Sequence, residues 1–309
     1  MPEQMPFPIK CLCDVEEVDL ASLPHFSSGI KSLDKIILGL FEKQLIVITG
    51  KRGQGKSTFA SQILANALDE GKNVFAYSGE LPDYHFRNWL DMQIAGVQNM
   101  DAQKNNYGDM IYSIKKSALD ELTKFYRGRA YIFDNQNIPQ GKQLQETLVG
   151  AVEYAAKELK CKVILIDNIM TAVDMLSADP YAVQGDFVKK IKAIANNMDV
   201  TIILIAHPRK TKNGEEIQND DVSGTGDITN LADVVLSYSR LQKSGTKDPT
   251  ENGKYQSAIS VTKNRLNGRL AQYDDVIKVR YSESTKRIVS DNDAPNKMMC
   301  CFKPDFAPF

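Results

Sequence analysis

Residues 48–58, ITGKRGQGKST, place three glycines, two lysines and three hydroxyl side chains at the end of a run of apolar residues. Gly50, Gly55, Lys56 and Ser57 fit the pattern G-x-x-x-x-G-K-[S/T] at every fixed position. Glycines let successive backbone N–H groups point inward at phosphate oxygens, and a following helix adds unpaired N–H groups and the positive end of its dipole. The segment therefore predicts a loop that binds the phosphates of a nucleotide.

The side chains of this loop suit the same chemistry. Lys56 is expected to neutralise the outer phosphates, and the Ser57 hydroxyl is expected to ligate Mg²⁺. Gly53, Gln54 and Thr58 belong to the same loop and are expected to contact the nucleotide.

A metal site of this kind also needs an aspartate at the end of a buried strand, where it holds the water shell of the metal. Two runs offer one: AYIFD ends at Asp134, and VILID ends at Asp167. We favour Asp167, because its run is more uniformly aliphatic, as a central strand requires, and because Asn168 adds a second polar group. Asp134 is expected to end a neighbouring strand and to cap a loop.

Two further polar residues end apolar runs. Glu80, in YSGELP, is a candidate to orient and deprotonate the attacking water, and the alternative is a solvated loop glutamate. His207, in LIAHPRK, is a candidate to hydrogen-bond the γ-phosphate and to report its loss to the following loop. The alternative for His207 is a histidine that only ends a strand.

The segment PRKTKNGEEIQNDDVSGTGD is a polar stretch of about twenty residues, and loops of that length inside a domain are usually functional. Arg209, Lys210 and Lys212 supply positive charge, and Gly224 and Gly226 supply exposed backbone amides. Both kinds of group suit a phosphodiester backbone. The alternative is a charged face that is only solvated.

Strand-like runs that alternate with helical stretches must position these residues. A helix is expected from Ser57 to about Glu70, and the strand-like runs before residue 230 are 44–50, 72–80, 129–135, 162–168 and 200–207. Three more runs follow at 232–240, 255–265 and 275–282. The pattern predicts a doubly wound α/β domain whose mainly parallel sheet is extended by antiparallel C-terminal strands. We expect a linker or N-terminal arm at 1–28, this domain at 29–290 and a flexible tail at 291–309.

The composition restricts the class of protein. The formal net charge of −1 means that nucleic-acid contacts must come from local patches. No apolar run approaches the roughly 18 residues of a membrane span, so no membrane partner is expected. The first residues carry no signal-peptide pattern, and the odd number of cysteines, five, indicates free thiols in a reducing compartment.

This set of motifs resembles the ATPase domain of hexameric replicative helicases: the DnaB-type proteins, and still more the phage primase–helicases and the mitochondrial helicase Twinkle. The resemblance covers about residues 26 to 290 and implies a RecA-like P-loop NTPase fold. AYSGEL is similar to the strand that ends in the catalytic glutamate, VILIDN to the metal-binding strand, and IAH to the sensor strand. VSGTGD resembles the DNA-binding loop, although Ser223 stands where the family usually has an arginine.

The resemblance assigns roles to four further residues. KNR is similar to the K-x-R pair that reaches into the ATP site of the adjacent subunit, so Arg265 is the expected arginine finger and Lys263 its companion. Arg240 and Tyr281 fall where phage-type members sandwich the adenine base.

The resemblance implies an ATP-dependent replicative DNA helicase motor that uses ATP and Mg²⁺ and acts as a ring, expected to be hexameric, on single-stranded DNA. Primase, polymerase or loader proteins are expected partners, and the cytoplasm of a bacterial or phage-infected cell is the expected location. The alternative is a RecA- or KaiC-like ATPase without unwinding activity. A small-molecule kinase would need an arginine-rich lid, which we do not find in the sequence, and a purely structural DNA-binding module would not need an intact phosphate loop.

Overall fold

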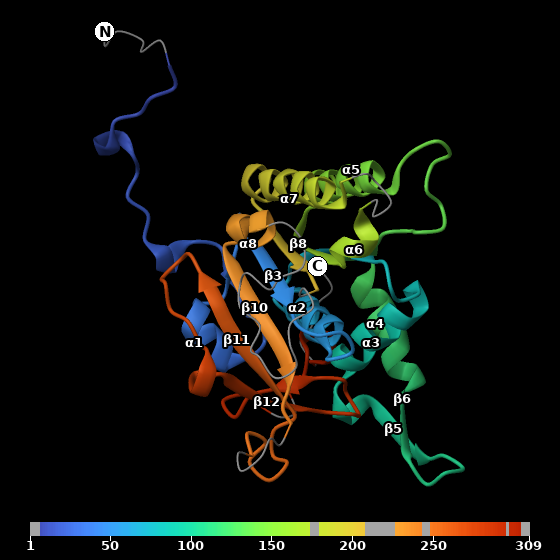
Figure 1. Cartoon of the computed structure of the whole chain (residues 1–309). Helices are drawn as coiled ribbons and strands as arrows, with labels where there is room; N and C mark the ends of the chain where they lie inside the picture. The colour runs from blue at the N-terminus through green and yellow to red at the C-terminus, as the bar shows by residue number, and fades with distance from the viewer. Residues whose placement is uncertain (1–6, 174–178, 208–225, 243–247, 295–296, 304–309) are drawn as a thin grey trace.

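A central β-sheet with helices on both faces forms the body of the molecule (Figure 1). The structure, a computed structural model, describes residues 7–173, 179–207, 226–242, 248–294 and 297–303. Within these residues nine strands form one sheet in the order β13-β12-β11-β10-β3-β9-β8-β4-β7. All neighbours from β10 to β7 run parallel, and β11, β12 and β13 are antiparallel to their neighbours. The α/β layout expected from the sequence is therefore present.

The strands of this sheet have between two and eight residues in the described ranges. From one edge to the other they are β13 (Ile288–Val289), β12 (Ile277–Tyr281), β11 (Ser257–Asn264), β10 (Val234–Arg240), β3 (Leu45–Thr49), β9 (Thr201–Ile205), β8 (Cys161–Asp167), β4 (Asn73–Ser78) and β7 (Ala130–Ile132).

Two hydrophobic cores lie on the two faces of the sheet. In β3, Ile46 and Ile48 pack into one core, whereas Leu45 and Val47 pack into the other, because successive side chains of a strand point to opposite faces. Covering both faces explains why these strands are almost continuously apolar. The helices of the first core are α1 (Lys31–Ile37), α2 (Lys56–Asp69), α3 (Asp83–Ala95) and α4 (Lys116–Tyr126). Those of the second are α5 (Leu144–Lys157), α6 (Ile169–Ala172), α7 (Pro180–Asn197) and α8 (Gly226–Leu231).

The pairing of β10 differs from the sequence-based expectation that all three C-terminal runs extend the sheet antiparallel. β10 pairs in parallel with β3 and antiparallel with β11, so the change of direction occurs one strand later. The reason is the connection. α8 lies in the chain between β9 and β10, so β10 can run in the same direction as β9 and β3, whereas β11 follows β10 in the chain and runs back beside it.

A hairpin of β5 (Met100–Lys104) and β6 (Met110–Ile114) forms a separate two-stranded sheet that projects from the body beside α3 and α4 (Figure 1). Tyr107 at its turn is largely exposed.

Two segments outside the predicted domain bounds of 29–290 also contact the domain. β1 (His25–Phe26) pairs with β2 (Leu40–Phe41), and the chain before β1 extends away from the body (Figure 1). The sequence predicts a flexible tail from residue 291, whereas Met299 and Cys301 in its described part are buried in the first core. The N–H of Cys300 donates to the Asp69 carboxylate at the end of α2, at 2.5 Å.

None of the helices in the described ranges is long and apolar enough to cross a membrane. All five cysteines are free thiols, as the sequence indicates.

Candidate nucleotide-binding site

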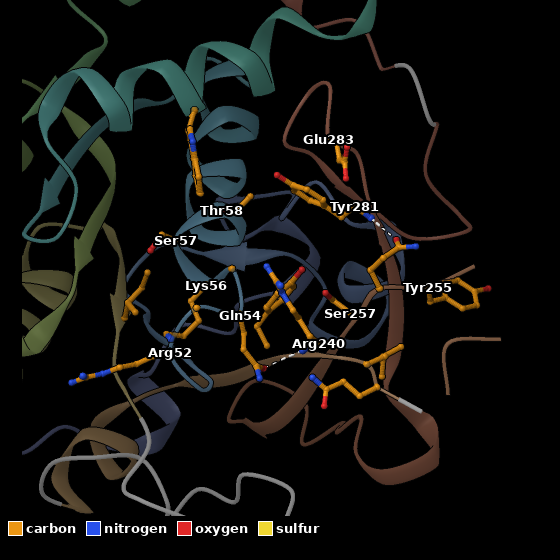
Figure 2. A pocket seen from close by; sticks show the side chains of 18 of the residues that line it. Arg52, Gln54, Lys56, Ser57, Thr58, Arg240, Tyr255, Ser257, Tyr281 and Glu283 are labelled. Atoms are coloured by element: carbon orange, nitrogen blue, oxygen red, sulfur yellow. Dashed lines mark hydrogen bonds between the residues drawn. The ribbon is translucent and has the colours of Figure 1, made fainter. Parts of the chain in front are cut away.

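A cavity of about 1040 Å³ lies where the carboxyl ends of β3, β4, β8 and β9 meet (Figure 2). Ligands bind at this edge in open α/β sheets, because the loops after parallel strands converge there. The residues predicted from the sequence that line the cavity are Gly53, Gln54, Gly55, Lys56, Ser57, Thr58, Glu80, Asp167, His207, Arg240 and Tyr281. Residues separated by more than 200 positions in the chain thus share one site.

The phosphate loop runs from the end of β3 to the start of α2. Gly50 does not line the cavity, but it lies so close to β10 that a Cβ atom there would be 2.2 Å from the carbonyl oxygen of Tyr238. Its φ of 147° is in the range that favours glycine. Gly50 therefore permits the close packing that shapes the loop.

Lys56 projects within this loop. Its Nζ donates to the carbonyl oxygens of Gly50 and Lys51, at 2.8 and 3.0 Å, and the residue is only 5% exposed. Burial lowers the pKa of Lys56, while the carboxylates of Asp167 and Glu80 oppose this shift. The two carbonyl groups hold the ammonium at the phosphate loop.

The N-terminus of α2 opens into the same cavity. Gly55 is its N-cap residue, and no side chain among the described residues caps this end. The first N–H groups of a helix have no partner inside the helix, and they attract anions together with the helix dipole. With Lys56 beside them, these groups fit the phosphates of a nucleotide.

Asp167 and Ser57 form the candidate metal site. Asp167 ends β8 and is 2% exposed, and the Ser57 hydroxyl lies close enough to lower the pKa of its carboxyl group. Burial raises the pKa of Asp167 to about 6, and the nearby Glu80 adds to this, whereas Ser57 and Lys56 act in the opposite direction. A carboxylate and a hydroxyl side by side are oxygen ligands of the kind that Mg²⁺ prefers. These two residues therefore fit Mg²⁺.

Asp134, the other aspartate considered for this role, is placed differently. It follows β7 at the edge of the sheet and does not line the cavity. Its carboxylate accepts hydrogen bonds from the backbone N–H of Gln136 and the amide of Asn137, at 2.9 and 2.6 Å. This geometry is that of a capped loop.

Glu80 and His207 lie together in the cavity, next to Asn168. Nε2 of His207 is 3.4 Å from Oε1 of Glu80, and the Asn168 amide lies between their side chains. The pKa of His207 lies below its ordinary value, because burial and then the Lys56 charge disfavour the imidazolium form. His207 is therefore neutral near pH 7. A carboxylate beside the phosphate loop can accept a proton from water.

Arg240 and Tyr281 lie at the end of the cavity formed by β10 and β12 (Figure 2). The N–H of Arg240 donates to Oε1 of Gln54 at 3.0 Å, and the N–H of Tyr281 donates to Oε1 of Gln256 at 3.0 Å. These bonds tie β10 and β12 to the loop and to the segment before β11. A planar cation and an aromatic ring at this end suit the flat face of a base.

Other lining residues were not anticipated from the sequence. They include Arg52, Trp89, Tyr238, Tyr255, Ser257 and Glu283. Tyr238 stacks on Phe59 of α2, with ring centroids 5.6 Å apart. The sequence indicates Tyr238 only by its position in a strand. It precedes Arg240 by two residues, so the two side chains lie on the same face of the sheet.

Lys263 and Arg265 do not line this cavity. Nζ of Lys263 donates to the carbonyl oxygens of Thr229 and Asn230, at 2.6 and 3.1 Å. The guanidinium of Arg265 donates to Asn230 as well and lies 3.4 Å from the Asp233 carboxylate. The Arg265 side chain is 49% exposed, so it is accessible from outside the chain.

The predicted DNA-contacting residues Arg209, Lys210, Lys212 and Gly224, with Ser223, lie outside the described residues. Gly226 begins α8, whose C-terminal carbonyl groups hold Lys263 and Arg265. The predicted DNA-binding loop and the predicted finger are therefore joined by one short helix.

Comparisons with known proteins agree with the motifs. The family model described as the DnaB-like helicase C terminal domain matches residues 26–289. The chain is 19% identical over 285 residues to the replicative DNA helicase DnaB of Haemophilus influenzae, and the alignment covers 86% of this chain and 60% of that protein. It is 24% identical over 227 residues to the DNA helicase/primase of Enterobacteria phage T3, which covers 70% of this chain and 38% of that protein. The chain thus spans less than two thirds of the length of these relatives.

Solved structures show the same fold. A DnaB-like replicative helicase studied with its primase interactions superposes with a TM-score of 0.65 at 15% identity, covering 86% of this chain and 63% of that one. A second structure, described as an ATPase domain, gives 0.65 at 15%, covering 87% and 92%. A KaiC-like protein of Pyrococcus horikoshii gives 0.58 at 18%, covering 87% and 99%. The RecA-like fold expected from the sequence is confirmed, and because the family model spans most of the chain, the protein belongs to the DnaB-like helicase C-terminal domain family.

Proposed function

We propose that this chain is the ATP-hydrolysing motor domain of a replicative DNA helicase, which acts as a homo-oligomeric, hexameric ring on single-stranded DNA and unwinds duplex DNA. The observation that carries the proposal is the convergence of the phosphate loop, Asp167 and Glu80 on one cavity in a member of this family. Residues 29–290 would form the motor, with 1–28 as an arm and 291–309 as a tail. The cytoplasm of a bacterial or phage-infected cell is the proposed location, and primase, polymerase or loader proteins are proposed partners.

The residues of the cavity have distinct roles in this proposal. The N–H groups of the loop and Lys56 hold the phosphates of ATP. Mg²⁺, when bound, neutralises charge on the phosphates, and Ser57 and Asp167 are the residues that would hold it, Asp167 through water. Glu80 orients the attacking water and accepts its proton, so that the bond to the γ-phosphate breaks and ADP and phosphate are formed. Arg240 and Tyr281 hold the base.

The cation for the transition state is proposed to come from the neighbouring copy of the chain. Lys263 and Arg265 lie outside their own cavity, and Arg265 is half exposed. An arginine supplied from another subunit can stabilise the charge on the transferring phosphoryl group. Arg52 lines the cavity of its own chain and is the alternative source, although its side chain points away from the loop in Figure 2.

DNA contact is proposed for Arg209, Lys210, Lys212, Gly224 and Gly226. His207 precedes this segment and would sense the γ-phosphate, so hydrolysis would move the loop along one DNA strand. Support comes from the position of His207 beside Glu80 and from α8, which follows the segment and contacts Lys263 and Arg265.

The decisive experiment combines mass measurement in solution with a strand-displacement assay. With an ATP analogue and single-stranded DNA, we expect a ring mass; with ATP, we expect displacement of a labelled strand, and no displacement by Lys56→Ala. DNA-stimulated ATP hydrolysis without displacement would instead favour a RecA- or KaiC-like ATPase, a function suggested by the likeness to the KaiC-like protein. Hydrolysis by monomers alone would contradict the shared site.

A further inference from the structure

The side-chain amide of Asn168 connects Glu80 with His207. Its Nδ2 lies 2.5 Å from Oε1 of Glu80 and 3.1 Å from Nε2 of His207. Asn168 follows Asp167 directly and is only 1% exposed. One buried amide thus contacts both groups that are proposed to act on the water and on the γ-phosphate.

The orientation of this amide follows from the start of α6. Oδ1 of Asn168 accepts a hydrogen bond from the N–H of Thr171 at 3.2 Å, and the N–H of Asn168 donates to the Thr171 hydroxyl at 3.3 Å. These two bonds form a capping box. Since Oδ1 faces the Thr171 N–H, the NH₂ end of the amide faces Glu80 and His207. A flipped amide would lose the cap and would place a carbonyl oxygen against the Glu80 carboxylate.

This orientation favours one tautomer of the neutral His207 ring. An amide N–H that donates to Nε2 requires Nε2 without a proton, so the ring then carries its proton on Nδ1, which is buried and has no hydrogen-bond partner among the described residues. The other tautomer would donate from Nε2 to Oε1 of Glu80, 3.4 Å away, and would lose the shorter contact with Asn168. His207 can donate from Nε2 to a phosphate only in a form that cannot accept the bond from Asn168.

The same amide restrains the Glu80 carboxylate. The Glu80 side chain is 52% exposed, so without a fixed partner it would sample several rotamers in solvent. Asn168 holds Oε1 and leaves Oε2 available to accept a proton from water. A hydrogen bond to a charged carboxylate is among the stronger ones in proteins.

We propose that Asn168 is a positioning residue that orients Glu80 for proton transfer and couples this orientation to the contact of His207 with the γ-phosphate. The coupling follows because one amide supplies both hydrogen bonds, and one of them must break when Nε2 donates elsewhere. The proposal rests on the function proposed above.

The first test is kinetic. Asn168→Leu removes both donors, and Asn168→Asp removes them but keeps an acceptor for the N–H of Thr171, which protects the fold. We expect both variants to lower kcat for ATP by about 10- to 100-fold, the effect of losing one hydrogen bond to a charged group, with the Kd of an ATP analogue changed by less than about threefold. Thr171→Val removes only the hydroxyl, whereas the backbone N–H that orients the Asn168 amide remains, so this variant should retain kcat.

A double variant shows whether Asn168 acts through Glu80. In a Glu80→Gln background, Asn168→Leu should lower kcat by less than about twofold, because no general base is left to orient. An unchanged kcat in the single variants, or the same fold-loss with and without Glu80, would overturn the proposal.

The second test needs no turnover. The chain has only three histidines, so the ¹⁵N resonances of the His207 ring can be assigned by comparison with His207→Gln. At about pH 8, above the ordinary histidine pKa of about 6.5, we expect the Nδ1–H form in the wild type and the Nε2–H form in Asn168→Leu. An Nε2–H ring in the wild type would refute the role of Asn168. If the wild type hydrolyses no ATP, the proposed function fails, and this spectrum still decides whether Asn168 controls His207.

Discussion

Nζ of Lys56 donates a hydrogen bond to the carbonyl oxygen of Gly50, at 2.8 Å and within the same loop. A second bond, to Lys51, holds the ammonium almost fully buried. The loop therefore positions a positive charge beside the N-terminus of α2. A cation and unpaired helix N–H groups at one place favour the binding of a phosphate.

Replacing Lys56 should abolish turnover without unfolding the protein. We expect Lys56→Ala to lower kcat/KM for ATP by at least about 10²-fold, because one preorganised donor to the phosphates is lost. The fold should persist, since the substitution also removes a buried charge. Hydrolysis and thermal unfolding should be measured in parallel, with Lys51→Ala as the control from the same loop. Hydrolysis by Lys56→Ala at the wild-type rate would contradict the phosphate-loop assignment.

The raised pKa of Asp167 predicts how the rate of ATP hydrolysis falls at low pH. Burial raises this pKa to about 6, and only the ionised carboxylate suits the water shell of Mg²⁺. We therefore expect the apparent affinity for Mg²⁺, and with it kcat at limiting Mg²⁺, to fall as the pH drops below about 6. A Mg²⁺ titration at several pH values measures this, and saturating Mg²⁺ should shift this fall to lower pH. An apparent Mg²⁺ affinity independent of pH between about 5 and 7 would contradict it.

The same pKa shift predicts that Asp167 weakens the folded state at neutral pH. Its folded pKa of about 6 exceeds the ordinary value of 3.8, so the folded protein binds the proton more tightly. The stabilisation that the bound proton gives to the folded state is complete below pH 3.8 and is lost as the pH rises through about 6. Asp167→Asn should therefore raise the free energy of unfolding at pH 8 by up to ~3 kcal/mol while hydrolysis is lost. Denaturant unfolding at pH 8 and pH 5 tests this, because the gain should shrink at the lower pH.

The sequence was sufficient to predict the elements around the cavity. Continuous apolar runs such as those of β3 and β8 are typical of strands covered on both faces, and Gly55 and Lys56 mark the point where the loop becomes a helix. The choice of Asp167 over Asp134 rested on the same reasoning, and the structure places only Asp167 in the cavity. Its role as a metal ligand stays a prediction.

Features that depend on contacts between distant segments could not be read from local patterns. The direction of β10 depends on which strand it joins, and its alternating pattern is compatible with either direction. The burial of Cys301 depends on the surface offered by α4, against which Cys300–Phe302 packs and which a short Pro-rich tail does not reveal. The link from Asn168 to His207 joins residues 39 positions apart through side-chain geometry alone.

Removing positive charge from the segment between His207 and α8 should weaken binding of single-stranded DNA. Each phosphate contact contributes about 0.7 to the slope of log K against log salt, so Lys210→Ala with Lys212→Ala should lower the slope by about 1.4. Binding should be measured over a salt series with an ATP analogue present. Lys142→Ala with Lys157→Ala removes the same charge at exposed positions near and on α5 and should leave the slope unchanged. An unaltered slope in the Lys210 and Lys212 variant would mean that these lysines are only solvated.

Arg265 offers the sharpest test of a shared active site. Arg265→Ala should bind an ATP analogue as the wild type does but lose about 10³-fold or more in kcat, as expected for an arginine finger. The exposed Arg269 is a matched control a few residues away, and Arg52→Ala tests the arginine of the same chain. Lys56→Ala and Arg265→Ala should each be inactive alone. When the two variants are mixed, some interfaces combine an intact phosphate loop from one copy with an intact Arg265 from the next, so activity should return. No recovery in mixed rings, with mixing verified by mass, would place the action of Arg265 within its own chain.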